Sequence, residues 1–290
     1  MKALILALLV VAIAAELAVT PEYTAYLKKH VSWEVVDYEE NIFKGWTVEE
    51  VRTLLGDEDR EVITDVAPYI ATSIPSSVNW AGASCIHEIH NQGNCGSCWA
   101  FATASVASDK CCLGGKDYGW LSPQELVSCD RTNSGCNGGL ASEALKYVMS
   151  KGLVPESCYP YVGAQQACPT KCKDGSDWTA AHVCKAKSLT NCGTLPAMKS
   201  CLLKGPITIR MKVYSDFFNY KSGVYCWDQK SAFQGGHAIR GVGYSDSPKA
   251  HIICANSWGP SWGESGLFRI EAREECGVRL TAGDAWSPEY

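Results

Sequence analysis

The distribution of cysteines constrains this chain more than any other feature. Sixteen cysteines lie between residues 85 and 276, and none precedes residue 85. In an oxidising compartment most of them would pair as disulfides, whereas in a reducing one such a set would point to metal binding or catalysis. The interpretation therefore depends on where the chain is sent.

Residues 1–15, MKALILALLVVAIAA, have the features of a secretory signal peptide. A lysine near the start precedes a short apolar run that ends in small residues with A-x-A spacing. The alternative is a membrane anchor, but the run is shorter than the ~20 residues needed to span a bilayer. We therefore expect a secreted chain, or one in a lysosome-like or vacuolar compartment, with most cysteines paired and no membrane partner.

The length and charge of the chain set broad limits. With 290 residues, 46% of them apolar, it can form one globular domain or two closely packed ones. Its 26 basic and 31 acidic side chains give a net charge of −5, and neither sign forms a long run. This balance argues against nucleic acid or anionic lipid as a partner and says nothing about a substrate.

Residues 16–74 form an acidic segment without cysteines in front of the cysteine-rich body. We interpret this segment as a removable propeptide, and the alternative is a small solvated helical subdomain. The boundary is expected near Ser73–Pro75, where the acidic segment ends, so that 75–290 would be the mature chain.

The mature chain has the pattern of an α+β protein in two halves. Apolar residues recur at helical spacing over 98–112 and 140–151, and SPQELVSC (122–129) opens with a Ser-Pro helix start. From about residue 205 the sequence changes to short β-rich runs, such as PITIRMKVY and HIICANSW, separated by turn residues. The pattern predicts a mainly helical first half and a mainly β second half.

The stretch NQGNCGSCWAFA (91–102) holds Cys95 and Cys98 three positions apart. Such a pair can be a redox couple, half of a zinc site, or a disulfide partner beside a free nucleophile. A polar, turn-like run precedes the pair instead of a strand, which disfavours the redox couple, and the secretory route disfavours zinc. Cys98 would begin a helix, where unpaired N–H groups and the helix dipole stabilise a thiolate.

A cysteine nucleophile needs an imidazole, and His237 in QGGHAIRGVGY is the strongest candidate. Asn256 in ANSWGPSWGESG could accept the imidazole N–H, with Trp258 and Trp262 shielding that bond from water. Gln92, six residues before the nucleophile, could supply an oxyanion-hole donor together with the backbone N–H of the nucleophile. Singly, a histidine, an NSWG turn and a glutamine are ordinary structural features, but together they predict nucleophilic catalysis.

His87 and His90 in HEIH suggest a metal-binding pair. Their spacing is one residue short of the i, i+4 zinc motif, and no third ligand is evident. Both are interpreted as surface or structural residues, and no metal or cofactor is expected.

Four motifs resemble the papain family of cysteine proteases: QGNCGSCWAF, GCNGG (135–139), GGHAI and NSWGPSWGESG. The resemblance implies a helical left domain, about 84–170, a β-barrel-like right domain, about 171–290, and an active-site cleft between them. It implies a zymogen that hydrolyses polypeptides through a thioester on Cys98, with His237 as acid and base and its own propeptide as inhibitor. A monomer is expected. The alternatives are a catalytically inactive cysteine-rich binding homologue, and acyl transfer to an amine instead of water.

The resemblance also implies three disulfides: Cys95–Cys136, Cys85–Cys112 and Cys226–Cys276. With Cys98 free, an odd number of cysteines remains, so at least one more is unpaired, and we select Cys254 inside the apolar strand HIICA. The pairing of the others stays open: Cys111, Cys129, Cys158, Cys168, Cys172, Cys184, Cys192 and Cys201.

Within the family, DFFNYKSGVY (216–225), GGHAIR and VASDK (106–110) resemble the cathepsin-B-like branch, as do Trp33, Asn41 and Trp46 in the propeptide. The substrate-binding residues implied are Gly138, Gly139, Leu140, Ala141, Ala238, Trp258 and Thr281. An apolar residue is expected two positions before the cleaved bond. Arginine there should be poor, because Thr281 stands where cathepsin B has a glutamate.

Cathepsin B removes dipeptides because paired histidines of an occluding loop bind the substrate's C-terminal carboxylate. In this chain the region from GCNGG to KGPITI (204–209) has CPTKC (168–172) as the remnant of such a loop and His182 as its only histidine. We therefore expect an endopeptidase in which the occluding loop is missing.

Overall fold

The computed structural model describes residues 15–58 and 64–290. The predicted signal peptide lies, except for its last residue, outside the described residues. Within these two ranges, no helix is long and apolar enough to cross a membrane.

The second half of the chain forms one sheet with the strand order β3-β10-β4-β7-β8-β9-β6, and β2 also pairs with β7. The strands are β2 (Ser77–Asn79), β3 (Ser188–Asn191), β4 (Ile207–Tyr214), β6 (Val224–Tyr225), β7 (Phe233–Ser245), β8 (His251–Ala255), β9 (Leu267–Glu271) and β10 (Ala285–Glu289). The pairs are antiparallel except β6 with β9. Its core includes Ile209, Met211, Phe217, Tyr244 and Phe268.

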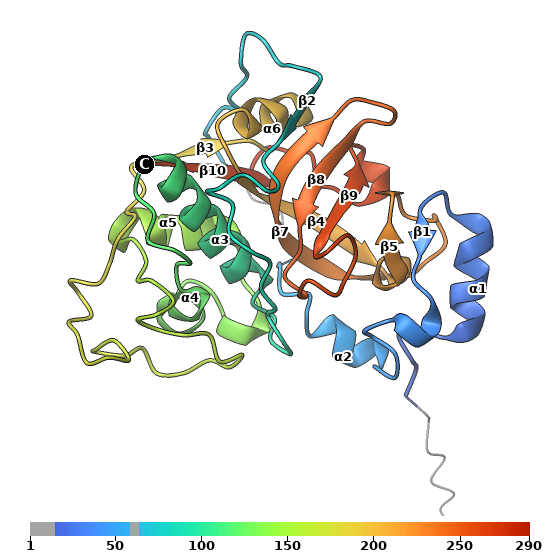
Figure 1. The fold of residues 1–290 in the computed structure, drawn as a ribbon, viewed down its shortest axis with the longest axis horizontal. Helices are drawn as coiled ribbons and strands as arrows, with labels where there is room; N and C mark the ends of the chain where they lie inside the picture. Colours follow the sequence, from blue (N-terminus) through green and yellow to red (C-terminus); the bar gives the residue numbers. More distant parts are fainter. Residues whose placement is uncertain (1–14, 59–63) are drawn as a thin grey trace, which may run out of the picture.

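Three helices form the first half: α3 (Cys98–Leu113), α4 (Pro123–Cys129) and α5 (Ala141–Lys151). The start of α4 follows from its sequence, because Pro123 occupies the first turn and Ser122 Oγ accepts the Glu125 N–H at 3.0 Å. α3 is buried over most of its length, since it lies between the other two helices and β7 (Figure 1). The predicted α+β architecture with a helical and a β half is confirmed.

Two features of residues 75–290 add to the prediction. The disulfide Cys111–Cys184 ties the segment after α5 to α3, and Cys158–Cys172 closes a loop within that segment. A helix that the sequence did not predict, α6 (Leu195–Leu202), lies between β3 and β4 in the chain. Short 3-10 helices complete residues 75–290: η2 (Gly135–Asn137), η3 (Ser215–Asn219) and η4 (Glu274–Cys276).

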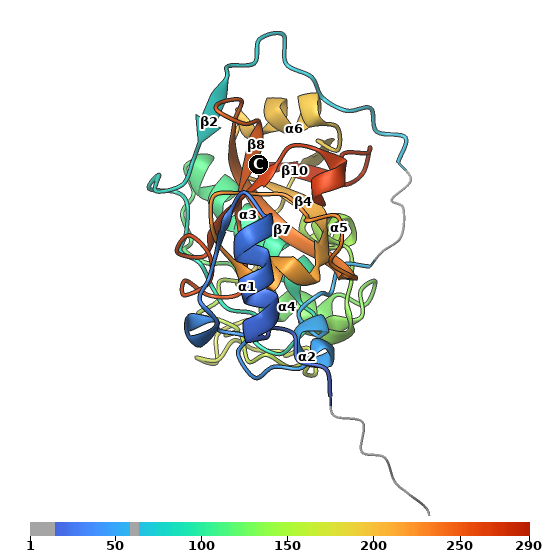
Figure 2. The same ribbon diagram turned by 90° about the vertical axis from the view of Figure 1, so that its right-hand side faces the viewer.

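The N-terminal segment packs along the β half, as Figure 1 and Figure 2 show from two sides. It contains α1 (Pro21–His30), β1 (Glu34–Val35), η1 (Tyr38–Glu40) and α2 (Val48–Arg52), and β1 pairs with β5 (Tyr220–Ser222). The Trp33 side chain is buried and donates its Nε1–H to Cys226 O at 3.0 Å. Asn41 Nδ2 donates to Phe218 O at 3.1 Å. These contacts do not fit a solvated subdomain.

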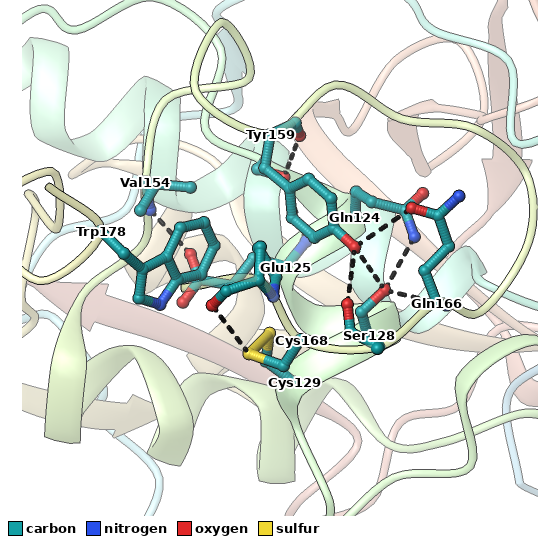
Figure 3. The surroundings of a disulfide bond; sticks show 12 residues. Gln124, Glu125, Ser128, Cys129, Val154, Tyr159, Gln166, Cys168 and Trp178 are labelled. Atoms are coloured by element: carbon teal, nitrogen blue, oxygen red, sulfur yellow. Dashed lines mark hydrogen bonds between the residues drawn. A yellow bond between two sulfur atoms is a disulfide. The ribbon is translucent and has the colours of Figure 1, made fainter. Parts of the chain in front are cut away.

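Seven disulfides join the described cysteines. Three are the pairs that the family resemblance implies: Cys85–Cys112, Cys95–Cys136 and Cys226–Cys276. The others are Cys111–Cys184, Cys129–Cys168, Cys158–Cys172 and Cys192–Cys201. Figure 3 shows the Cys129–Cys168 bond, which ties the end of α4 to the loop that contains CPTKC. Cys98 and Cys254 are free and buried.

Candidate active site

Cys98 is the first residue of α3 and is completely buried. Its Sγ lies 3.5 Å from the backbone nitrogen of Ala238 on β7, so the thiol of the helical half meets a strand of the β half. Backbone N–H groups in the first turn of a helix have no partners within the helix, and such a position favours an anion. The thiol therefore occupies the place that a nucleophile of this kind requires.

His237 precedes Ala238 on β7 and is also completely buried. Its Nε2 lies 2.8 Å from Asn256 Oδ1, which also accepts the backbone N–H of Ser257 at 2.8 Å. A backbone N–H can only donate, so the atom that accepts it is the amide oxygen, and Nε2 carries the ring proton. Among the described residues Nδ1 has no hydrogen-bond partner. This nitrogen is the one that can take a proton from Cys98.

The Trp258 indole lies beside the imidazole of His237, and Trp262 packs against Trp258. The Trp258 ring lies 5.0 Å from the His237 ring, centroid to centroid, and Trp262 packs edge-on against Trp258 at 5.1 Å. Both indoles are almost fully buried. Because a hydrogen bond is stronger where water is excluded, this packing holds the imidazole in one orientation.

Gln92 lies in the same cluster with its side chain buried. Its Nε2 donates to two backbone carbonyls, Cys95 O at 2.8 Å and Leu54 O at 2.9 Å. Ser257 Oγ donates to Gln92 Oε1 at 2.6 Å and so fixes the amide. The predicted oxyanion-hole donor, Gln92 Nε2, thus hydrogen-bonds to the carbonyl oxygen of Leu54 in the N-terminal segment.

Residues 54–58 of the N-terminal segment, called the covering strand below, cross these groups, and Asp57 forms isolated β-bridges with Gly139 and Gly236. The Gly56 N–H hydrogen-bonds to the Cys98 thiol, and Gly56 O accepts the Gly139 N–H at 2.8 Å. Asp57 N donates to Gly236 O at 3.2 Å. The approach requires glycine, since a Cβ on Gly56 would lie 1.9 Å from the carbonyl oxygen of Gly96. The strand therefore covers the thiol completely.

Burial opposes ionisation of both reactive groups in this closed form. It raises the pKa of the Cys98 thiol to about 12, in spite of backbone N–H groups that hydrogen-bond to the sulfur, and the Asp57 carboxylate adds to the rise. Burial also lowers the pKa of His237 to about 4, against its hydrogen bond to the asparagine. The sequence suggested a stabilised thiolate at the helix start, but here the loss of solvation outweighs the helix dipole. The closed form holds a neutral thiol beside a neutral imidazole.

The expected substrate-binding residues fall into two groups. Gly138 and Gly139 line the covering strand, and Gly138 has φ of +118° with Gly56 O lying 3.0 Å from where its Cβ would be. Leu140, Ala141 and Ala238 are buried, and Trp258 lies over the imidazole. Thr281 is exposed, and its backbone N–H and its hydroxyl donate to Asp284 Oδ2.

Two charged residues of this region were missed from the sequence. Arg210 on β4 and Asp284 are both buried, and Arg210 Nη1 lies 3.0 Å from Asp284 Oδ1. Arg210 Nε lies 2.9 Å from Asp57 Oδ2 in the covering strand. The available signal was a single arginine inside an otherwise buried strand, ITIRMKVY.

The other histidines that the sequence raised lie in structural contacts. His87 Nδ1 lies 2.9 Å from Asp109 Oδ1, and the His90 ring stacks on Trp120 at 3.9 Å between centroids. Within the described residues, one Cys/Glu group is compact enough for a metal ion: Cys226, Glu271 and Cys276. Its two sulfurs are bonded to each other and cannot act as thiolate ligands.

Comparison with known proteins shows similarity to cysteine proteases in sequence and in fold. The chain matches the family described as "Papain family cysteine protease" over residues 74–283. It is 39% identical over 254 residues to "Cathepsin B-like CP3" of Giardia intestinalis, which covers 81% of this chain and 84% of that protein. It is 33% identical over 226 residues to "Cathepsin B" of Dictyostelium discoideum, covering 72% of each. Among solved structures, "proCathepsin B S9 from Trypanosoma congolense" is similar with a TM-score of 0.78 at 26% identity, covering 92% of this chain and 99% of that one.

Proposed function

Since this chain belongs to the papain family of cysteine proteases, we propose that it is a zymogen whose mature form hydrolyses peptide bonds through a thioester on Cys98. The observation that carries the proposal is the strand 54–58, which occupies Gln92, covers Cys98 and follows Gly139 as a bound peptide would. A catalytically inactive binding homologue has no need of an imidazole whose Nε2 is held by Asn256 while Nδ1 has no hydrogen-bond partner among the described residues.

In the proposed reaction His237 Nδ1 accepts the thiol proton as the sulfur attacks the scissile carbonyl carbon. The negative charge that develops on the carbonyl oxygen is bound by Gln92 Nε2 and the Cys98 backbone N–H. The imidazolium then gives its proton to the leaving amine, which leaves a thioester on the sulfur. Water activated by the same nitrogen hydrolyses the thioester, and Asn256 keeps the ring oriented throughout.

The direction in which the covering strand runs through the cleft supports its role as an inhibitor. Along the covering strand, Leu54 contacts Gln92, Gly56 contacts Cys98, and Asp57 pairs with Gly139. A substrate has its preceding residues on the Gly139 side and its leaving group on the Gln92 side, so the covering strand runs in the opposite direction. No carbonyl carbon of the strand is then presented to the sulfur as a substrate would present it.

The proposed mature chain begins near Ser73–Pro75. β2 (Ser77–Asn79) pairs with β7 in the central sheet, so a cut before residue 77 would leave the sheet intact. N-terminal sequencing and intact-mass measurement before and after acidification locate the cut. The disulfides and the signal-like N-terminus favour the secretory pathway, with a lysosome-like or vacuolar compartment or the exterior as the destination.

The contacts of His182 support endopeptidase activity. Its Nε2 lies 2.9 Å from the buried Glu125 Oε1, and its Nδ1 lies 2.8 Å from Trp178 O, so both ring nitrogens are engaged within the helical half. A histidine held in this way does not offer a cation to the C-terminal carboxylate of a substrate. We infer that the occluding loop is missing and that the primed side of the cleft admits a continuing chain.

The test compares casein digestion by acid-treated wild type and variants. Cys98→Ala and His237→Ala should abolish digestion, Asn256→Ala should reduce it less, and Cys254→Ser should keep it. Near-normal digestion by Cys98→Ala would end the proposal. A matched pair of quenched peptides, one ending as a free acid two residues after the scissile bond and one amidated and longer, separates the two peptidase types. An added amine with product masses would reveal acyl transfer.

A further inference from the structure

A buried group of three charged side chains lies beside the active site, where the sequence predicted an apolar pocket. Asp57 of the covering strand, Arg210 of β4 and Asp284 before β10 are each 4% exposed or less. Arg210 Nε contacts both carboxylate oxygens of Asp57, at 2.9 and 3.0 Å, and its Nη1 lies 3.0 Å from Asp284 Oδ1. The guanidinium also donates to the backbone carbonyl of Glu58.

The position of Asp57 identifies the subsite that it fills. Its neighbour Gly56 contacts the Cys98 thiol, and Asp57 itself bridges Gly139 on one side and Gly236 on the other. The residue that places its carbonyl carbon on the sulfur is the last one before the cleaved bond. In a substrate, the second residue before the cleaved bond lies next to that residue, on the Gly139 side. The Asp57 side chain therefore occupies the position of the side chain of this second substrate residue.

Strand register places Arg210 in the same subsite independently of the covering strand. Arg210 pairs with Ala238 across β4 and β7, and Ala238 N–H is the group that contacts the thiol. Paired residues of neighbouring strands project from the same face of a sheet. Arg210 therefore remains at the edge of the site after the N-terminal segment has left.

Two arginines and one aspartate act electrostatically on the Asp57 carboxylate. Arg210 and Arg279 both attract Asp57 electrostatically, and Asp284 is the acidic residue that repels it. Asp284 accepts the Arg210 guanidinium at Oδ1 and hydrogen bonds from Thr281 at Oδ2, so both of its oxygens are engaged. An apolar substrate side chain would offer no acceptor to the Arg210 Nε–H, which Asp57 accepts here. A substrate arginine would be repelled by the charge of Arg210.

We propose, as a specificity that rests on the proposed protease function, that Arg210 selects aspartate or glutamate as the second residue before the cleaved bond. The acidic side chain takes the place of the Asp57 carboxylate and accepts the Nε–H of the guanidinium. Asp284 is the positioning residue that orients Arg210 toward the cleft. The apolar preference that the sequence suggested is replaced by this one.

The test uses quenched peptides that differ only at this position, with Asp, Glu, Asn, Leu or Arg, and the cut is located by mass spectrometry. Because the Arg210 Nε–H needs an acceptor in the buried subsite, kcat/KM for Asp should exceed that for Leu by on the order of 10- to 100-fold. Arg should be the poorest. A Leu peptide cleaved as fast as the Asp peptide, by an enzyme that digests casein, would overturn the inference and leave the proposed function intact.

Variants separate selection from folding. Arg210→Met combined with Asp284→Asn, made in an Asp57→Asn background, removes all three buried charges together, and it should lose the preference for Asp over Leu in kcat/KM. Arg210→Lys retains the charge without the Nε–H and should keep a weaker preference, which serves if the combined variant does not fold. Arg273→Met removes an exposed arginine paired with Glu271 and should leave the preference unchanged.

A binding measurement tests the subsite without catalysis. The N-terminal segment is cut off by a site-specific protease, and a labelled peptide covering residues 50–58 is titrated with Asp, Asn or Leu at position 57. Tighter binding of the Asp peptide supports the inference. Equal binding of the Asp, Asn and Leu peptides overturns the inference. This outcome does not depend on whether the enzyme digests casein, so the inference and the proposed function are tested separately.

Discussion

Removal of the N-terminal segment should turn Cys98 from an inert thiol into a reactive one, and the structure sets the size of the change. In the closed form burial raises the pKa of the Cys98 thiol from 9.0 to about 12. Only the thiolate reacts with iodoacetamide, so at pH 7 this rise lowers the reactive fraction roughly a thousandfold. Departure of the strand removes the burial and the Asp57 charge together, and a protonated His237 can then stabilise the thiolate further.

The pH dependence should also differ between the two forms. Burial lowers the pKa of His237 to about 4, so the imidazole of the closed form is neutral above that value. The closed thiol ionises only near pH 12, and its alkylation should therefore rise about tenfold for each pH unit between about 6 and 9. In the open enzyme an imidazolium and a thiolate can form as a pair, and the rate should be nearly flat over the same range.

The assay treats the proenzyme and the acid-activated enzyme with iodoacetamide for graded times and counts modified Cys98 by mass spectrometry. Cys254 is an internal control, because it is buried in β8 and burial also raises its pKa, so it should stay unmodified in both forms. Rates at Cys98 that agree within about tenfold at pH 7 would refute the reasoning that the covering strand holds the thiol neutral.

Three further predictions concern other contacts. Burial raises the pKa of Asp57 from 3.8 to about 6 in spite of Arg210, so the closed form takes up a proton and gains stability as the pH falls from 6 to 4. Asp57→Asn lacks this effect, so its activation rate divided by that of wild type should increase as the pH falls from 6 to 4. A ratio that does not change with pH would contradict this prediction. The hydrogen bond to Glu125 raises the pKa of His182, so its stabilising effect is complete below pH 6.5 and lost as the pH rises through the raised value. His182→Gln should therefore lower Tm more at pH 5 than at pH 9. Cys129→Ser with Cys168→Ser should cost about 2–4 kcal/mol in denaturant unfolding, and an unchanged midpoint would speak against this.

The elements around the site were predictable where their signals are local. The start of α4 is marked by Ser122 and Pro123, and β8 by an apolar run between turn residues. β10 was missed because its sequence, AWSPE, contains Pro288, which lacks an N–H and is usually excluded from strands. It is a strand because its N-terminal residues pair with β4 while the rest pairs with β3, a partner far away in the sequence.

The residues of the site could be proposed from motif spacing, and the structure brings Cys98, His237, Asn256 and Gln92 into one cluster. The ionisation of the thiol could not be predicted in the same way. Helix position is a local property, but the pKa depends on how much water reaches the sulfur, and that depends on Gly56, more than forty residues earlier in the chain.

The missed role of Arg210 has a physical reason that also strengthens its assignment. In ITIRMKVY the polar residues Thr208, Arg210 and Lys212 alternate with apolar ones, and a period of two normally places such residues on a solvated face. Lys212 is indeed exposed, but Thr208 and Arg210 are buried. The polar face of β4 thus passes from solvent into the cleft between residues 212 and 210. Asp284 pairs with one edge of the Arg210 guanidinium, and the Nε–H edge meets the residue that fills the cleft. The N-terminal segment supplies Asp57, and once it leaves, an acidic substrate residue is the group that restores the pairing.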